Sequence, residues 1–290
     1  MKLKSIGFNT GIRYNWHVLD VLEVFSRLEV QKVELWGAPP HADLTSERLV
    51  RRLGKFQRES PLDIVAVHPP ARGEWNITSK QEDRRLRAVN LLKKIMDNLL
   101  QIGVDKVVLH PGEHRSSSDA QDQELLLRSA DSIQRLLEHL EGRSQILCLE
   151  NTLPHHIGGR LEDLLWLEKN VAGEFFITFD TSHASLGDVP LREYIDAFGK
   201  KIRHTHLSDN RGEDDDHLTP GEGNLGFSSI LRRLSERAYL DYWMLEVLRA
   251  PGITKIEELI EHSRQSFSRL LKETFARPHG RRSSSGAPTA

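Results

Sequence analysis

The segment Ile146-Leu147-Cys148-Leu149-Glu150-Asn151-Thr152 is a short apolar run followed at once by polar residues. Short runs rich in Val, Ile and Leu are typical of parallel strands that are buried on both faces. Here the run ends at a glutamate, and a buried carboxylate is costly unless it has a partner. The segment therefore predicts a buried strand whose carboxyl end bears a functional side chain.

Seven further apolar runs of this kind recur along the chain. The eight runs are Ser5–Phe8, Val33–Trp36, Ile64–Val67, Lys106–Leu109, Ile146–Leu149, Phe175–Phe179, Ile202–Thr205 and Tyr242–Leu245. Between them lie stretches whose apolar residues recur every three or four positions, as in amphipathic helices. The clearest are Val18–Leu28, Leu86–Ile102, Leu125–Leu140 and Ile256–Leu271.

Eight strand–helix units, spaced roughly 25 to 45 residues apart, predict an α/β protein with a single (β/α)8 TIM barrel. A doubly wound sheet is the alternative. That fold normally has a phosphate-binding glycine loop after its first strand. Phe8-Asn9-Thr10-Gly11 is not such a loop, so we favour the barrel.

The chain of 290 residues fits one catalytic barrel domain over residues 1–276. Residues 277–290, RPHGRRSSSGAPTA, are rich in Ser, Gly, Pro and Arg, and we expect a disordered tail there. The formal net charge of -2 gives no general attraction to nucleic acid or an anionic membrane. The single cysteine, Cys148, excludes an intramolecular disulfide. We expect a cytoplasmic protein without a membrane partner, and a homo-oligomer is compatible with the sequence.

Six successive predicted strands end in a residue that can bind a metal or move a proton. These residues are His68, His110, Glu150, Asp180, His206 and Glu246. In a TIM barrel the carboxyl ends of the strands meet at one mouth, where active sites of this fold lie. Charged groups gathered there are costly unless a cation compensates them. The strand ends therefore predict a metal centre.

Three more residues extend this set. Asp180 and His183 are three positions apart, so both can face the mouth. Asp215 and His217 alternate in the loop after the seventh strand and can point the same way if the loop is extended. Mixed imidazole and carboxylate ligands suit Zn, Mn, Fe or Co better than Mg or Ca. Nine groups are too many for one ion, whereas two or three ions with bridging carboxylates would use them all.

Two other residues are candidates for binding substrate. Glu34 has inward parity on the second strand, and Arg211 follows the end of the seventh. A structural hydrogen bond for Glu34 and a solvated loop position for Arg211 are equally compatible with the sequence. His204 shares the parity of His206 one layer deeper, so we expect it to support the site or lie in the core. Three further histidines are predicted loop residues near the mouth rather than ligands: His114, His155 and His156.

Taken in order, these motifs resemble the xylose isomerase-like TIM-barrel superfamily. The superfamily includes sugar-phosphate isomerases and epimerases, and also the endonuclease IV family. The motifs are HPP at His68, HPG at His110, ENT at Glu150, DTSH at Asp180, HLSDN at His206, HLTPGEGN at His217, and the strand-end residue Glu246. The resemblance extends from the first predicted strand to the last.

The resemblance implies one of two active sites. In the isomerase branch one divalent ion would be held by four residues: Glu150, Asp180, His206 and Glu246. Glu150 and Glu246 would also move protons on opposite faces of an enediolate, and His183 would contact the substrate. In the endonuclease IV branch all nine candidate residues would hold three zinc ions that serve phosphoester hydrolysis.

The sequence contains features of both branches. All nine residues are present, which favours phosphoester chemistry. The segment Pro69-Pro70-Ala71-Arg72 lacks the bulky aromatic side chain that helps endonuclease IV penetrate the DNA helix. The stretches Val33–His41 and HLSDNRG to HLTPGEGN look more like the isomerase branch.

The function we expect from the sequence is a sugar or sugar-phosphate isomerase or epimerase that depends on one to three divalent ions, Zn, Mn or Co. Its partner is then a small sugar or sugar phosphate. The alternative is an endonuclease IV-like trinuclear zinc phosphodiesterase acting on abasic DNA or a small phosphodiester. DNA is a partner only under this alternative. A non-catalytic barrel that binds metal or sugar is a third hypothesis.

Overall fold

Eight parallel strands form the centre of the protein in a computed structural model, which describes residues 5–115, 118–187, 189–238 and 240–276. The predicted disordered tail lies outside the described residues. The strands are β1 (Ser5–Asn9), β2 (Lys32–Trp36), β3 (Asp63–His68), β4 (Lys106–Leu109), β5 (Ile146–Glu150), β6 (Phe176–Asp180), β7 (Ile202–His206) and β8 (Tyr242–Leu245).

The strands pair in chain order, and β1 also pairs with β8, so the sheet curls on itself. Backbone hydrogen bonds close the remaining gap between β7 and β8. The amide of Leu207 donates to the carbonyl of Met244 at 2.9 Å, and the amide of Glu246 donates to the carbonyl of Leu207 at 3.2 Å. The prediction of a (β/α)8 barrel is confirmed.

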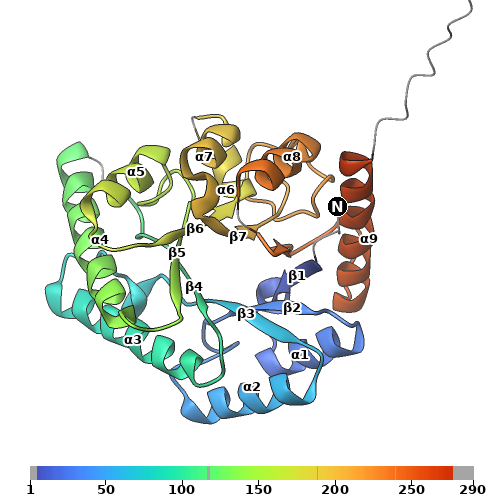
Figure 1. The fold of residues 1–290 in the computed structure, drawn as a ribbon, viewed down its shortest axis with the longest axis horizontal. Helices are drawn as coiled ribbons and strands as arrows, with labels where there is room; N and C mark the ends of the chain where they lie inside the picture. The colour runs from blue at the N-terminus through green and yellow to red at the C-terminus, as the bar shows by residue number, and fades with distance from the viewer. Residues whose placement is uncertain (1–4, 116–117, 188, 239, 277–290) are drawn as a thin grey trace, which may run out of the picture.

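The helices form a ring outside the strands (Figure 1). The α-helices are α1 (Val18–Arg27), α2 (Glu47–Glu59), α3 (Glu82–Leu100), α4 (Asp119–Leu140), α5 (Leu161–Asn170), α6 (Thr181–Ser185), α7 (Leu191–Phe198), α8 (Phe227–Arg237) and α9 (Ile256–Phe275). Short 3-10 helices are η1 (Thr10–Arg13), η2 (Gly73–Trp75) and η3 (Gly199–Lys201). Among the described residues no helix combines the length and apolar character needed to cross a membrane.

Four strands extend to include the functional residue that the sequence placed just beyond them. β3, β5, β6 and β7 end at His68, Glu150, Asp180 and His206. The reason is that backbone pairing continues to the last residue, as in the register pairs Trp36–His68 and Asp180–His206. These side chains therefore project from rigid sheet rather than from loops.

The last helix, α9, packs against β8 near the start of the chain. Its Phe267 is fully buried and meets the ring of Trp243 edge-on, with centroids 6.5 Å apart. Because the helix turns its apolar side toward the strands, this aromatic pair belongs to the main core.

Replacing Phe267 by alanine should lower the free energy of unfolding by about 3–5 kcal/mol, because the change removes a large ring from a closely packed core. Urea denaturation measures the loss. Leu165→Ala on α5 is the matched control, since Leu165 is 40% exposed and its truncation should cost only about 0.5 kcal/mol. Equal losses for the two variants would contradict this assignment of the core.

Candidate metal centre

The nine predicted ligands lie together at the carboxyl end of the barrel and form three groups. Within each group one ligand atom per residue lies within 4.8 Å of the others. The first group contains His68, His110 and Glu150. Glu150 Oε2 is 3.0 Å from His68 Nε2 and 3.2 Å from His110 Nε2, and the two imidazole nitrogens are 3.1 Å apart.

The second group contains Glu150, Asp180, His206 and Glu246, one residue from or just after each of four consecutive strands. His206 Nδ1 lies at its centre. It is 3.0 Å from Glu150 Oε1 and 3.1 Å from Glu246 Oε2. Because Glu150 has one oxygen in each of the first two groups, it can bridge them.

The third group contains His183, Asp215 and His217. Asp215 Oδ2 is 3.2 Å from His183 Nε2 and 2.9 Å from His217 Nε2. The other nitrogen of His183, Nδ1, is 3.3 Å from Glu150 Oε1 and connects this group to the second. The side chains of Asp215 and His217 thus meet as predicted, but the loop is not extended there, because His217 has a φ of 48°.

One buried atom in the second group lacks a partner. Asp180 is fully buried, and its Oδ2 accepts no hydrogen bond from the described residues. Burial raises the pKa of Asp180 to about 7, with His183 opposing the rise and the neighbouring carboxylates adding to it. Buried polar atoms are nearly always satisfied, and a divalent cation is a partner that carboxylates and an imidazole can share. The residues therefore fit a metal ion.

The pKa values of the neighbours show the same balance of charge. Burial opposes ionisation of Glu150, but the charges of His206 and His110 outweigh it and hold the pKa of Glu150 well below its usual value. For His206, burial lowers the pKa, and the three carboxylates of Glu246, Glu34 and Glu150 raise it well above normal. The carboxylates and His206 thus favour each other's charged forms.

Glu34 fixes the orientation of His206 from below. Its Oε1 is 2.9 Å from His206 Nε2, its Oε2 is 2.5 Å from His204 Nε2, and Asn9 donates an amide hydrogen bond to it. Burial raises the pKa of Glu34, but His206 and His204 outweigh this effect and the pKa is lowered. An ionised Glu34 accepts a hydrogen bond from the Nε2–H of His206, which leaves Nδ1 directed at the second group. This arrangement is common among metal-binding histidines. His204 has the supporting position that its parity predicted.

Neither predicted substrate-binding residue lies in the cavity wall. Glu34 is fully buried beneath His206, with its carboxylate already engaged. Arg211 is exposed, and its hydrogen bonds use its own backbone atoms. Its amide donates to the Asp216 carboxylate, and its carbonyl accepts from the Asn224 side chain. Their contact with substrate stays a prediction, and the structure provides a direct supporting role for Glu34 instead.

A cavity of about 380 Å³ opens above the three groups. Seven of the nine ligand candidates line it, while Asp180 and His206 are fully buried below. Its other walls are Trp36, Ala38, Pro69, Pro70, Ala71, Arg72, Leu153 and His156. This volume lies in the range of pockets for small molecules. Of the wall residues, His156 was predicted as a loop residue near the mouth, and it lines the cavity. The sequence offered no motif for Trp36 and Arg72; only their positions at or after a strand end could have indicated them.

Glu34→Gln should weaken divalent-metal binding at the second group by about 10- to 100-fold, because the amide no longer fixes the His206 tautomer through a charged hydrogen bond. The dissociation constant for Mn²⁺, measured by isothermal titration calorimetry, checks this. Glu74→Gln on η2 is exposed and should leave the constant unchanged. Identical constants for wild type and Glu34→Gln would contradict the role given to Glu34.

The chain is similar to both sugar epimerases and endonuclease 4 proteins. Fructoselysine 3-epimerase of Escherichia coli O157:H7 is 24% identical over 233 residues, covering 77% of this chain and 82% of that protein. A probable endonuclease 4 of Aster yellows witches'-broom phytoplasma is 24% identical over 260 residues, covering 82% and 88%.

Among solved structures, a D-tagatose 3-epimerase-like protein superposes with a TM-score of 0.80 at 22% identity, covering 93% of this chain and 98% of that chain. At this identity the likeness confirms the fold alone. Residues 22–269 match the profile of the family described as Xylose isomerase-like TIM barrel. The chain therefore belongs to the xylose isomerase-like TIM-barrel family, as the motifs predicted.

Proposed function

We propose that this protein is a divalent-metal-dependent epimerase or isomerase of a small sugar or sugar phosphate. The observation that carries the proposal is the pair of carboxylates, Glu150 and Glu246, that flank His206 Nδ1 at 3.0 and 3.1 Å beneath a small cavity. The relationship to a sugar epimerase and the family match support the same chemistry.

The second group would hold the catalytic ion in this proposal: Glu150, Asp180, His206 and Glu246. A divalent ion bound there supplies Lewis acidity that polarises a carbonyl and an adjacent hydroxyl of the substrate. His206 is held in place by Glu34, and Asp180 caps the short helix α6 by accepting the amide of His183 at 2.7 Å. Both ligands are thus fixed before substrate arrives.

Glu150 and Glu246 would move the protons. They come from β5 and from the end of β8, with β6 and β7 between them, so they approach the site from different sides. For Glu246, burial raises the pKa, but His206 outweighs it and the pKa is lowered, as it is for Glu150. One ionised carboxylate would remove the carbon-bound proton next to the carbonyl and later release it to solvent. The other would take a proton from solvent and deliver it to the opposite face.

His183 would bind the substrate. Its pKa is raised well above normal, since burial lowers it but Asp180 and Asp215 outweigh that effect. Its ring lines the cavity, with Nδ1 held at 3.0 Å from the Asn151 carbonyl and Nε2 at 3.2 Å from Asp215 Oδ2, so a substrate oxygen would share the Nε2 contact with Asp215. If no metal ion occupies the third group, Asp215 and His217 would hold that ring in place.

The cavity favours a small substrate over duplex DNA. A volume of about 380 Å³ suits a sugar. The wall at Pro69, Pro70 and Ala71 has no bulky aromatic side chain to enter a duplex. The net charge of -2 gives no general attraction to phosphate backbones.

A second candidate function, zinc-dependent phosphodiester hydrolysis, is favoured by one specific observation. The nine residues form three ligand groups, and Glu150 belongs to two of them. Three ions at these groups would stabilise negative charge developing on a phosphoester. The relative named as a probable endonuclease 4 supports this candidate.

Proton exchange with solvent tests the leading proposal. Protein loaded with Mn²⁺ or Co²⁺ should incorporate deuterium from D2O at the carbon next to the carbonyl in at least one member of a panel of ketoses and ketose phosphates. Glu246→Gln should lower kcat for that substrate by about 10²- to 10⁴-fold, as expected on removing a general acid–base group. Glu193→Gln, a distant charge change on α7, is the control.

The two functions are separated by bound metal and by product. About one ion per chain at the barrel groups at full activity and deuterium in the sugar would support the epimerase. Absence of exchange across the panel, together with about three zinc ions per chain and cleavage of abasic DNA or a small phosphodiester, would replace it with the hydrolase.

A further inference from the structure

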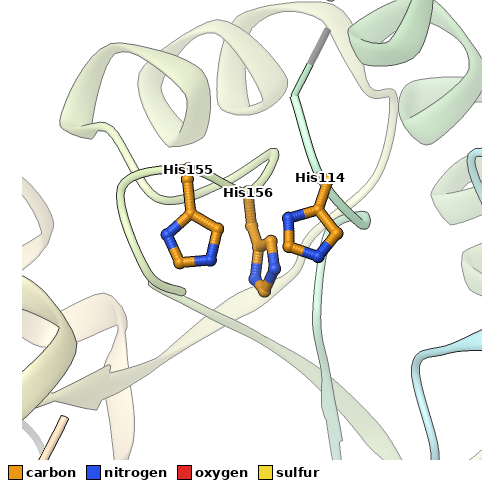
Figure 2. Close-up of side chains that lie close together, drawn as sticks. All are labelled: His114, His155 and His156. Atoms are coloured by element: carbon orange, nitrogen blue, oxygen red, sulfur yellow. The ribbon is translucent and has the colours of Figure 1, made fainter. Parts of the chain in front are cut away.

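Three histidines outside the nine candidate ligands lie side by side (Figure 2), and one of them, His156, also lines the cavity. His114 lies in the loop after β4, and His155 and His156 lie in the loop after β5. We refer to these three residues as the rim histidines. Figure 2 shows the ring of His156 between the other two.

The rings are close enough to share one ligand. The centroid of His156 is 4.5 Å from that of His114 and 4.4 Å from that of His155, and the latter two are 5.2 Å apart. One ring nitrogen from each lies within 4.8 Å of the others. Two nitrogens bound to one tetrahedral Zn²⁺ at about 2.05 Å are about 3.3 Å apart, so small side-chain movements would bring the three together.

His156 provides an independent sign of a missing partner. The residue is only 4% exposed, and its Nε2 has no hydrogen-bond partner among the described residues. A buried ring nitrogen without a partner is costly. His114 and His155 are exposed, so they are free to turn toward it.

The two loops are held together by their backbones. His114 and His156 form an antiparallel bridge, and the amide of Arg115 donates to the carbonyl of His155 at 2.8 Å. The guanidinium of Arg115 pairs with the carboxylates of Asp122 at 2.6 Å and Asp163 at 2.5 Å. These two carboxylates neutralise its positive charge. The rim histidines are therefore presented by a braced pair of loops.

The chemistry of the cluster selects the kind of ion. The group contains three imidazoles and no carboxylate among the described residues. The nearby carboxylate of Glu113 already accepts from the Gly73 amide and the Asn76 side chain. Three neutral imidazoles suit Zn²⁺, Ni²⁺ or Cu²⁺ and disfavour Mg²⁺ and Ca²⁺. The positive charge of Arg72 acts on His155 and His156, so it favours an anion as the fourth ligand.

We propose that the rim histidines bind one late first-row transition-metal ion, such as Zn²⁺, at a site separate from the three groups in the barrel. The ion joins the loops after β4 and β5. Because His156 also lines the cavity, the ion fixes that part of its wall. The site does not depend on which reaction the barrel groups perform.

Zinc content per chain tests the proposal. Wild type and the double variant His114→Ala/His155→Ala are dialysed to equilibrium against the same free Zn²⁺ at pH 7.5, and bound zinc is measured by elemental analysis. The double variant removes two exposed side chains and leaves the buried His156 in place. It should bind one zinc per chain fewer than wild type and unfold at the same temperature when metal-free.

His139→Ala is the matched control, since His139 lies near the far end of α4 and pairs with Asp97. It should retain the full zinc content. Equal zinc content in the double variant and wild type overturns the proposal, as does an equal loss in the control. If the double variant does not fold, His155→Asn replaces it and must weaken one zinc dissociation constant by roughly tenfold or more; an unchanged constant overturns the proposal.

Discussion

The contact of Glu150 with four imidazoles is the interaction on which the site depends. One oxygen lies 3.0 and 3.2 Å from the nitrogens of His68 and His110, and the other lies 3.0 and 3.3 Å from those of His206 and His183. A carboxylate with no solvent exposure is tolerated only when such partners offset its lost hydration. The rest of the centre is arranged around this residue, which joins the three ligand groups.

The barrel makes this contact possible because rigid sheet positions the ligands. Four of them end strands whose backbone pairing continues to the last residue, and His206 is further held by Glu34. The third group depends on the loop after β7 instead. That loop is fixed through Asp209, whose carboxylate accepts the amides of Gly221 and Leu225. Residues remote from the reacting atoms thus set the geometry at which metal and substrate would meet.

Much of the site could be predicted from the sequence, because alternation and strand parity determine which side chains face the mouth. This reasoning placed Glu150, Asp180 and His206 correctly. It could not show that Glu34 lies beneath His206 rather than in the cavity, since parity gives the direction of a side chain and not its depth. It also could not join His114 to His155, because loop pairing arises from tertiary packing that no local pattern records.

The side chains around Glu150 are expected to bind divalent ions, and anomalous diffraction from crystals grown with Mn²⁺ would detect such an ion. We expect an anomalous peak within bonding distance of Glu150, Asp180, His206 and Glu246. Well-ordered density for these four side chains with no peak among them, in crystals saturated with Mn²⁺ and again with Zn²⁺, would contradict it.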